Sequence, residues 1–147
     1  MPILNTKKLT LSVAESVSQG YLQSRLNQAA GTESWFMGGL LISSNDALIR
    51  LGVKNDLLNK SGIGSVQVAE ATARMAIKHF GSGVALSLVG DFAMNSIEVK
   101  MGTFYLCAII EGKTLCSTME IPLRKDIFRR RVAANTFLFL HRALMGS

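Results

Sequence analysis

Cysteine and proline are scarce in this chain of 147 residues, which contains two of each. Two cysteines cannot build the disulfide framework of a small secreted protein. The longest strongly apolar run covers residues 104–110, whereas a helix needs about 20 apolar residues to cross a bilayer. The first eight residues contain no apolar stretch of signal-peptide length. The sequence therefore predicts a cytoplasmic protein that is neither exported nor inserted in a membrane.

Linkers, repeats and low-complexity segments are also absent, so the length predicts one domain over residues 1–147. A chain of this length buries about 68–70% of its unfolded surface, which is sufficient for a core of its own. Apolar residues make up 48% of the sequence, a high fraction for a lone soluble domain. A homo-oligomer would cover part of that apolar surface, and we expect one.

The net charge of +6 arises largely near the C-terminal end, from Arg124, Lys125, Arg129, Arg130, Arg131 and Arg142. A basic segment can bind nucleic acid, but no interleaved aromatic residues or nucleic-acid motif accompany this one. Three successive arginines on a helix also point about 100° apart, so they cannot all face one phosphate backbone. The run predicts a solvated helix face, and nucleic acid is not an expected partner.

Hydrophobic periodicity predicts alternating strands and helices. We expect strands near residues 9–14, 35–43, 84–89, 101–110 and 113–121. We expect helices near residues 18–29, 45–51, 56–60, 65–80 and 124–145. Strands interleaved with helices, together with an antiparallel hairpin, indicate the α/β class. The expected architecture is a three-layer α/β/α sandwich with a mixed β-sheet.

The predicted hairpin turns at Glu111 and Gly112, which sets the pairing of its two strands. In that register Cys107 lies directly opposite Cys116 in a non-hydrogen-bonded pair, with Cα atoms about 4.5 Å apart. Because a cytoplasmic protein keeps its thiols reduced, we expect two small, buried apolar side chains rather than a disulfide.

Three sequence blocks carry a family resemblance. Residues 14–20 read Ala-Glu-Ser-Val-Ser-Gln-Gly. Residues 31–53 contain a Gly38-Gly39 pair, a Ser44-Asn45 pair and a final Arg-Leu-Gly-Val, and shorter matches occur at residues 86–90 and 102–105. In this order the blocks resemble the C-terminal domain of the CinA competence/damage-inducible proteins, the nicotinamide-nucleotide amidase family. The resemblance covers roughly residues 9–144 and implies the same three-layer fold, here without the large N-terminal domain of some relatives.

The resemblance implies a catalytic serine, tyrosine and lysine, of which this chain retains one. The serine is Ser16, while Ser43 and Leu48 occupy the tyrosine and lysine positions. A serine hydroxyl attacks an amide poorly unless a base accepts its proton, and leucine cannot do so. The family's glycine-rich loop is also altered, since the segment between Gly90 and Gly102 contains no glycine.

The resemblance further implies a ligand-binding set around Ser16 that comprises Glu15, Ser18, Thr32, Ser43 and Arg124. Other roles fit several of these residues: Ser16 also suits a helix N-cap, Glu15 a local ion pair, and the family arginine also aligns with Lys125. Glu33 would repel a phosphate bound beside it. His79 and His141 have no carboxylate or cysteine at ligand spacing, so we expect neither a metal nor a cofactor.

These departures favour a catalytically degenerate homologue of the amidases that acts as a binding or structural protein, with a small nucleotide as the expected ligand. The alternative is an active amidase that converts nicotinamide mononucleotide to nicotinate mononucleotide and ammonia. That enzyme would need another base in place of the missing lysine.

Overall fold

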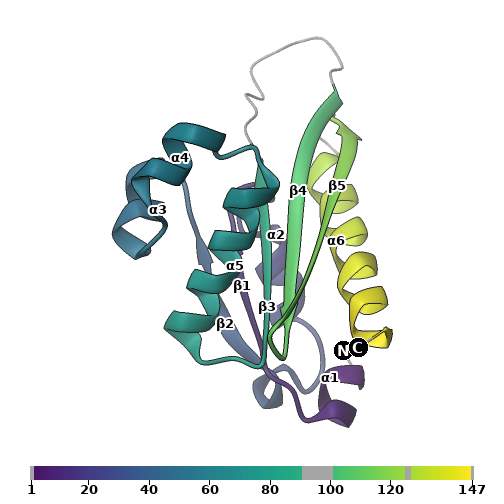
Figure 1. The fold of residues 1–147 in the computed structure, drawn as a ribbon. Helices are drawn as coiled ribbons and strands as arrows, with labels where there is room; N and C mark the ends of the chain where they lie inside the picture. Colours follow the sequence, from purple (N-terminus) through teal and green to yellow (C-terminus); the bar gives the residue numbers. More distant parts are fainter. Residues whose placement is uncertain (1, 91–100, 125–126, 147) are drawn as a thin grey trace.

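A mixed five-stranded sheet forms the centre of the protein (Figure 1). The computed structural model describes residues 2–90, 101–124 and 127–146. The strands are β1 (Leu11–Glu15), β2 (Phe36–Leu41), β3 (Val84–Gly90), β4 (Met101–Ile110) and β5 (Lys113–Pro122), in the order β2-β1-β3-β4-β5. β1 pairs in parallel with β2 and β3, while β4 pairs antiparallel with β3 and β5. The carboxyl ends of β1, β2, β3 and β5 therefore lie at one edge of the sheet.

Helices cover both faces of this sheet (Figure 1). On one face, α3 (Asn45–Leu51), α4 (Asn55–Ser61) and α5 (Val66–Phe80) share an apolar cluster with β-strand residues such as Ala85 and Ile109. On the other, α1 (Pro2–Lys7), α2 (Tyr21–Asn27) and α6 (Phe128–Met145) share a second cluster with Leu86 and Leu106. A short 3₁₀ helix, η1 (Thr32–Ser34), precedes β2. The predicted α/β sandwich with a mixed sheet is confirmed.

Local sequence signals explain why several elements were predictable. The Ser65 hydroxyl accepts a hydrogen bond from the Val68 amide, which caps α5, and Gly81 ends that helix with a φ of 66°. Glu111 and Gly112 both adopt positive φ, 47° and 86°, as a two-residue hairpin turn of type I′ requires. The predicted capped helix and hairpin are confirmed.

Other elements differ from the prediction. Neither α1 nor η1 was predicted, because a six-residue helix with Leu4 as its one buried side chain and a three-residue 3₁₀ helix are too short to display a helical repeat. α2 is shorter than predicted, and α6 begins at Phe128 rather than at residue 124. Residues 125 and 126 lie outside the described part of the chain.

The register of the cysteine pair is confirmed, but its predicted chemical state is wrong. Cys107 pairs with Cys116, their Cα atoms lie 4.1 Å apart, and a disulfide joins them. Cys107 is fully buried beneath α5, whereas Cys116 is exposed on β5, the last strand of the sheet. The predicted opposition brings the two sulfur atoms within bonding range, whereas the expected reduced state was based on the assumed cellular compartment.

Helix α2 packs closely against β2 at Gly39. A Cβ atom on this glycine would lie 2.5 Å from the Gln23 side-chain oxygen and 2.9 Å from the Val13 carbonyl oxygen. Distances below 3.0 Å require a neighbouring atom to move, and one of these two belongs to the backbone of β1. The second glycine of the Gly38-Gly39 pair is thus needed for helix α2 to approach the sheet.

We expect Gly39→Ala to lower the free energy of unfolding by about 1–3 kcal/mol, the usual cost of overpacking a filled site. Urea denaturation followed by circular dichroism measures this. Gly146→Ala is the matched control, because a Cβ there would come no nearer than 3.6 Å to any atom and its φ of −84° suits alanine. The control should remain within about 0.5 kcal/mol of the parent. Equal unfolding midpoints for the two variants would contradict the close-packing argument.

Candidate functional site

The edge of the sheet where four strands end holds most of the predicted site. Ser16 follows β1, Ser43 lies two residues beyond the end of β2, and Arg124 lies two residues beyond the end of β5. In α/β sheets, ligands bind beyond the carboxyl ends of the strands. Arg124 is three strands from β1, a separation of about 14 Å at 4.8 Å per strand. The altered segment at residues 91–100 lies outside the described part of the chain.

Glu15 is fully buried at the end of β1 and holds the turn that leads into α2. One carboxylate oxygen accepts a hydrogen bond from the Ser18 amide at 2.6 Å. The other accepts from the Ser18 hydroxyl and from the Gly20 amide, the latter at 2.8 Å. These contacts replace the local ion pair that was one predicted role for Glu15, and they tie both of its oxygens to the protein itself.

Ser18 links this carboxylate to the first turn of α2. Its hydroxyl donates to Glu15 and accepts a hydrogen bond from the Leu22 amide at 2.9 Å. The helix begins after Gly20, which has a φ of 87° and no side chain to cap it. Ser18 therefore satisfies a helix amide that would otherwise lack a partner. The alternative role of Ser16 as the N-cap is wrong, because Ser18 makes that contact.

Ser16 combines a fixed backbone with an unpaired side chain. Its amide donates to the Leu88 carbonyl of β3 at 3.1 Å, which continues the β1–β3 pairing by one residue. Its Oγ atom is buried and has no hydrogen-bond partner among the described residues. Buried hydroxyls are nearly always hydrogen-bonded, so an unpaired one marks a place where a ligand or an activating group would act.

Leu48 occupies the position at which the family resemblance implies a lysine. Its side chain is 1% exposed and packs in the apolar cluster that includes Ala14, Ile42 and Val53. Ser43, at the implied tyrosine position, is exposed. Neighbouring Ser44 caps α3, as its hydroxyl accepts a hydrogen bond from the Ala47 amide at 3.1 Å. Helix α3 thus presents a leucine, not an amine, to the core beside β1.

Thr32 lies at the opposite end of the sheet from Ser16. It precedes β2, which runs parallel to β1, so it is near the start of these strands and not their carboxyl ends. Its hydroxyl donates to the carbonyl groups of Leu26 and Ala29 at the end of α2. Glu33 is exposed in the same short helix. The structure does not bring Thr32 or Glu33 to Ser16.

Histidines and acidic residues do not assemble into a metal site in the described ranges, 2–90, 101–124 and 127–146. The Nε2 atom of His79 lies 2.8 Å from the Leu51 carbonyl oxygen, and His141 is exposed on α6. Within these same ranges, none of the helices has the length and apolar character to cross a membrane.

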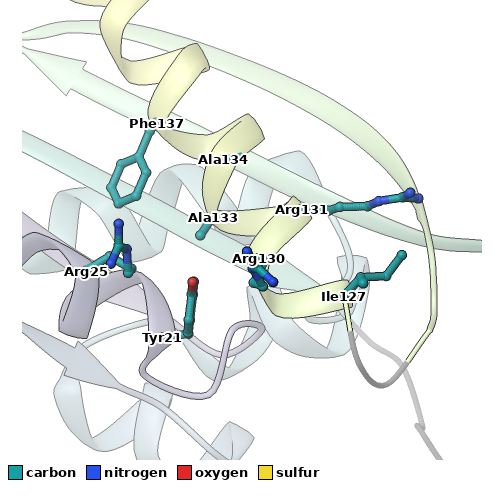
Figure 2. Close-up of a pocket in the computed structure, with 8 residues that line it drawn as sticks. All are labelled: Tyr21, Arg25, Ile127, Arg130, Arg131, Ala133, Ala134 and Phe137. Carbon is teal, nitrogen blue, oxygen red and sulfur yellow. The ribbon is translucent and has the colours of Figure 1, made fainter.

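A hollow lies between α2 and α6, and no motif in the sequence predicted it. It has a volume of about 490 Å³, and Figure 2 shows the side chains that line it. Its lining residues come from both helices and from the turn before α6, and comprise Tyr21, Arg25, Ile127, Arg130, Arg131, Ala133, Ala134 and Phe137. More than 100 positions separate the residues of α2 from those of α6 in the sequence, so no local motif joins them. The arginine run was the one available signal.

Removal of the Glu15 charge should destabilise the turn. In Glu15→Gln, the amide NH₂ group would face a backbone N–H group that needs an acceptor, at a site with no access to water. We expect a loss of about 1–3 kcal/mol in the free energy of unfolding, measured by urea denaturation. Glu33→Gln, an exposed carboxylate, is the matched control and should change stability by less than about 0.5 kcal/mol. An unchanged midpoint for Glu15→Gln would show that the turn does not depend on the carboxylate.

Solved structures share this arrangement of strands and helices. A CinA superfamily protein from Klebsiella pneumoniae superposes with a TM-score of 0.89 at 17% identity, covering 99% of this chain and 93% of that one. A competence/damage inducible protein from Agrobacterium tumefaciens gives a TM-score of 0.77 at 26% identity, with 96% and 88% covered.

Sequence comparison agrees with this likeness. A CinA-like protein from Kosmotoga olearia is 32% identical over 146 residues, which are 97% of this chain but 35% of that protein. This chain thus spans about a third of the length of the curated relatives that it matches. The family model for the CinA C-terminal domain matches residues 1–144. With that match over nearly its whole length, the chain belongs to the CinA C-terminal domain family.

Proposed function

We propose that this CinA C-terminal domain has lost amidase activity and acts as a binding protein. The observation that carries the proposal is the position of Leu48, which fills an apolar cluster at the point where the resemblance implies a lysine. Replacing it with an amine would place a charge among Ala14, Ile42 and Val53, which is costly without a partner.

The chemistry at Ser16 supports the same conclusion. Amide hydrolysis requires the serine proton to pass to a base as the oxygen attacks the carbonyl carbon. The Ser16 hydroxyl has no hydrogen-bond partner in the described part of the chain. The nearest carboxylate along the sequence, Glu15, is already bonded to Ser18 and Gly20. Ser43 can relay a hydrogen bond, but its hydroxyl is too weak a base to accept the Ser16 proton near neutral pH.

Lys54 is the one alternative base that the sequence suggests. It stands six residues beyond Leu48, at the start of α4, and is exposed. Between them, Gly52 ends α3 with a φ of 118° and Val53 is buried in the same cluster as Leu48. This part of the backbone is thus held in place, so that Lys54 would serve Ser16 only after a rearrangement.

We expect the purified protein to release ammonia from nicotinamide mononucleotide at the same rate as its Ser16→Ala variant. A coupled ammonia assay at millimolar substrate measures both rates. Release that is fast for an enzyme, about 1 s⁻¹ or more, and is abolished in Ser16→Ala would refute the proposal. In that event Lys54→Ala decides whether Lys54 is the substitute base, with the exposed Lys60→Ala as the matched control on the same helix.

A homo-oligomer is also proposed, because large apolar side chains are exposed at both outer strands of the sheet. Met37 and Leu41 are about half exposed on β2, and Leu115 on β5 is 44% exposed. Light scattering at micromolar concentration should give a mass of at least twice 15.9 kDa. Because the contact would be apolar, the mass should remain the same in 1 M salt. A monomer mass at tens of micromolar would exclude the assembly.

A further inference from the structure

The residues that line the hollow between α2 and α6 include none of the residues predicted to surround Ser16. Figure 2 shows Tyr21, Arg25 and Phe137 on one side of Arg130, while Arg131 extends away from them on the other side. The exposed Ala134 and the buried Ala133 lie between these larger side chains. Their small size leaves an opening of about 490 Å³, within the range of pockets that hold small organic molecules.

The charges around this hollow are of one sign. Three arginines line it, and no acidic side chain does so among the residues described. The Arg25 guanidinium donates to the neutral Gln28 side chain at 3.0 Å, whereas the arginines that form ion pairs in the described part of the chain, Arg50 and Arg74, lie elsewhere. Arg25 on α2 and Arg130 on α6 line the same hollow from different helices. Arginine binds phosphate groups through paired N–H donors.

The remaining lining residues are suited to an aromatic group. Tyr21 and Phe137 are partly buried, so their rings are anchored against the apolar cluster while one side of each remains accessible. Rings held in this way provide broad apolar contact, and a planar ligand can stack on them. A free phosphate would leave this surface uncovered, and an uncharged aromatic compound would leave the arginine charges without a counter-charge.

We propose that the hollow between α2 and α6 binds a small organic anion in which an aromatic ring is joined to a phosphate group, with Arg25 and Arg130 on the phosphate and Tyr21 and Phe137 beside the ring. The inference rests on the proposed function in one respect, that the chain is a binding protein. Ammonia release dependent on Ser16 would refute the loss of amidase activity but would leave this site in place.

Isothermal titration calorimetry with adenosine 5′-monophosphate tests the proposal. Adenosine supplies the ring without the phosphate, and inorganic phosphate supplies the charge without the ring. We expect the mononucleotide to bind, and each of the two fragments to bind at least about tenfold more weakly, because each loses one of the two kinds of contact. The absence of measurable binding at millimolar mononucleotide would overturn the proposal, as would equal affinities for mononucleotide and phosphate.

Matched variants locate the site. Arg25→Gln and Arg130→Gln should each weaken binding by about tenfold or more, since each removes a charge-assisted contact. Arg129→Gln removes the same charge from the same turn of α6 but does not line the hollow, so it should leave the affinity within about twofold. Because these arginines are exposed, the variants should retain the parent's thermal midpoint, which checks the fold.

Three results would contradict this location. An equal loss in Arg129→Gln and Arg130→Gln would indicate a diffuse basic surface. A loss of mononucleotide binding in Ser16→Ala would place the ligand at the carboxyl edge of the sheet. Tighter binding of a twelve-nucleotide single strand than of the mononucleotide, with equal dependence on Arg129 and Arg130, would indicate that the surface binds nucleic acid.

Discussion

The buried carboxylate of Glu15 is the contact on which the entry into the second helix depends. It accepts three hydrogen bonds from Ser18 and Gly20, and Ser18 in turn satisfies the first turn of α2. A charged group is retained in a dry environment only when its hydrogen bonds are complete, and here they are made within six residues of chain. The direction of α2 over β2, and hence its closeness to Gly39, follows from this turn.

An active site usually combines a fixed backbone with a chemically activated side chain, and at Ser16 these two properties are separated. The backbone around Ser16 is well fixed. The Ser16 amide donates to the Leu88 carbonyl, and the preceding residue, Glu15, is held by the hydrogen bond from the Ser18 amide to its carboxylate. Chemical activation, by contrast, needs a proton acceptor at the hydroxyl. At the position where the family resemblance implies a lysine, Leu48 packs in the apolar core. Under the proposed function, the scaffold keeps its shape for binding without amidase activity.

The fold was largely predictable from the sequence, because its signals are local. The Ser65 cap, Gly81 and the Glu111-Gly112 turn each specify a boundary within a few residues. The candidate site was less predictable, since its geometry depends on contacts across the sheet. Thr32 fits a binding motif in sequence but lies at the far end of the strands, and its hydroxyl closes the end of α2. The α2–α6 hollow joins Arg25 to Arg130, and no periodicity in either helix reveals that they meet.

The layer built from α1, α2 and α6 is assembled from both ends of the described chain (Figure 1). During synthesis on the ribosome, β1 to β5 and the opposite layer emerge before α6 does. Until then the sheet residues that α6 covers, including Leu106 and Ile121, lack the helix that contributes Val132, Leu140 and Leu144 to their cluster. Folding of this layer is thus coupled to the emergence of α6, and a nascent chain paused before residue 128 would expose an apolar sheet face to chaperones.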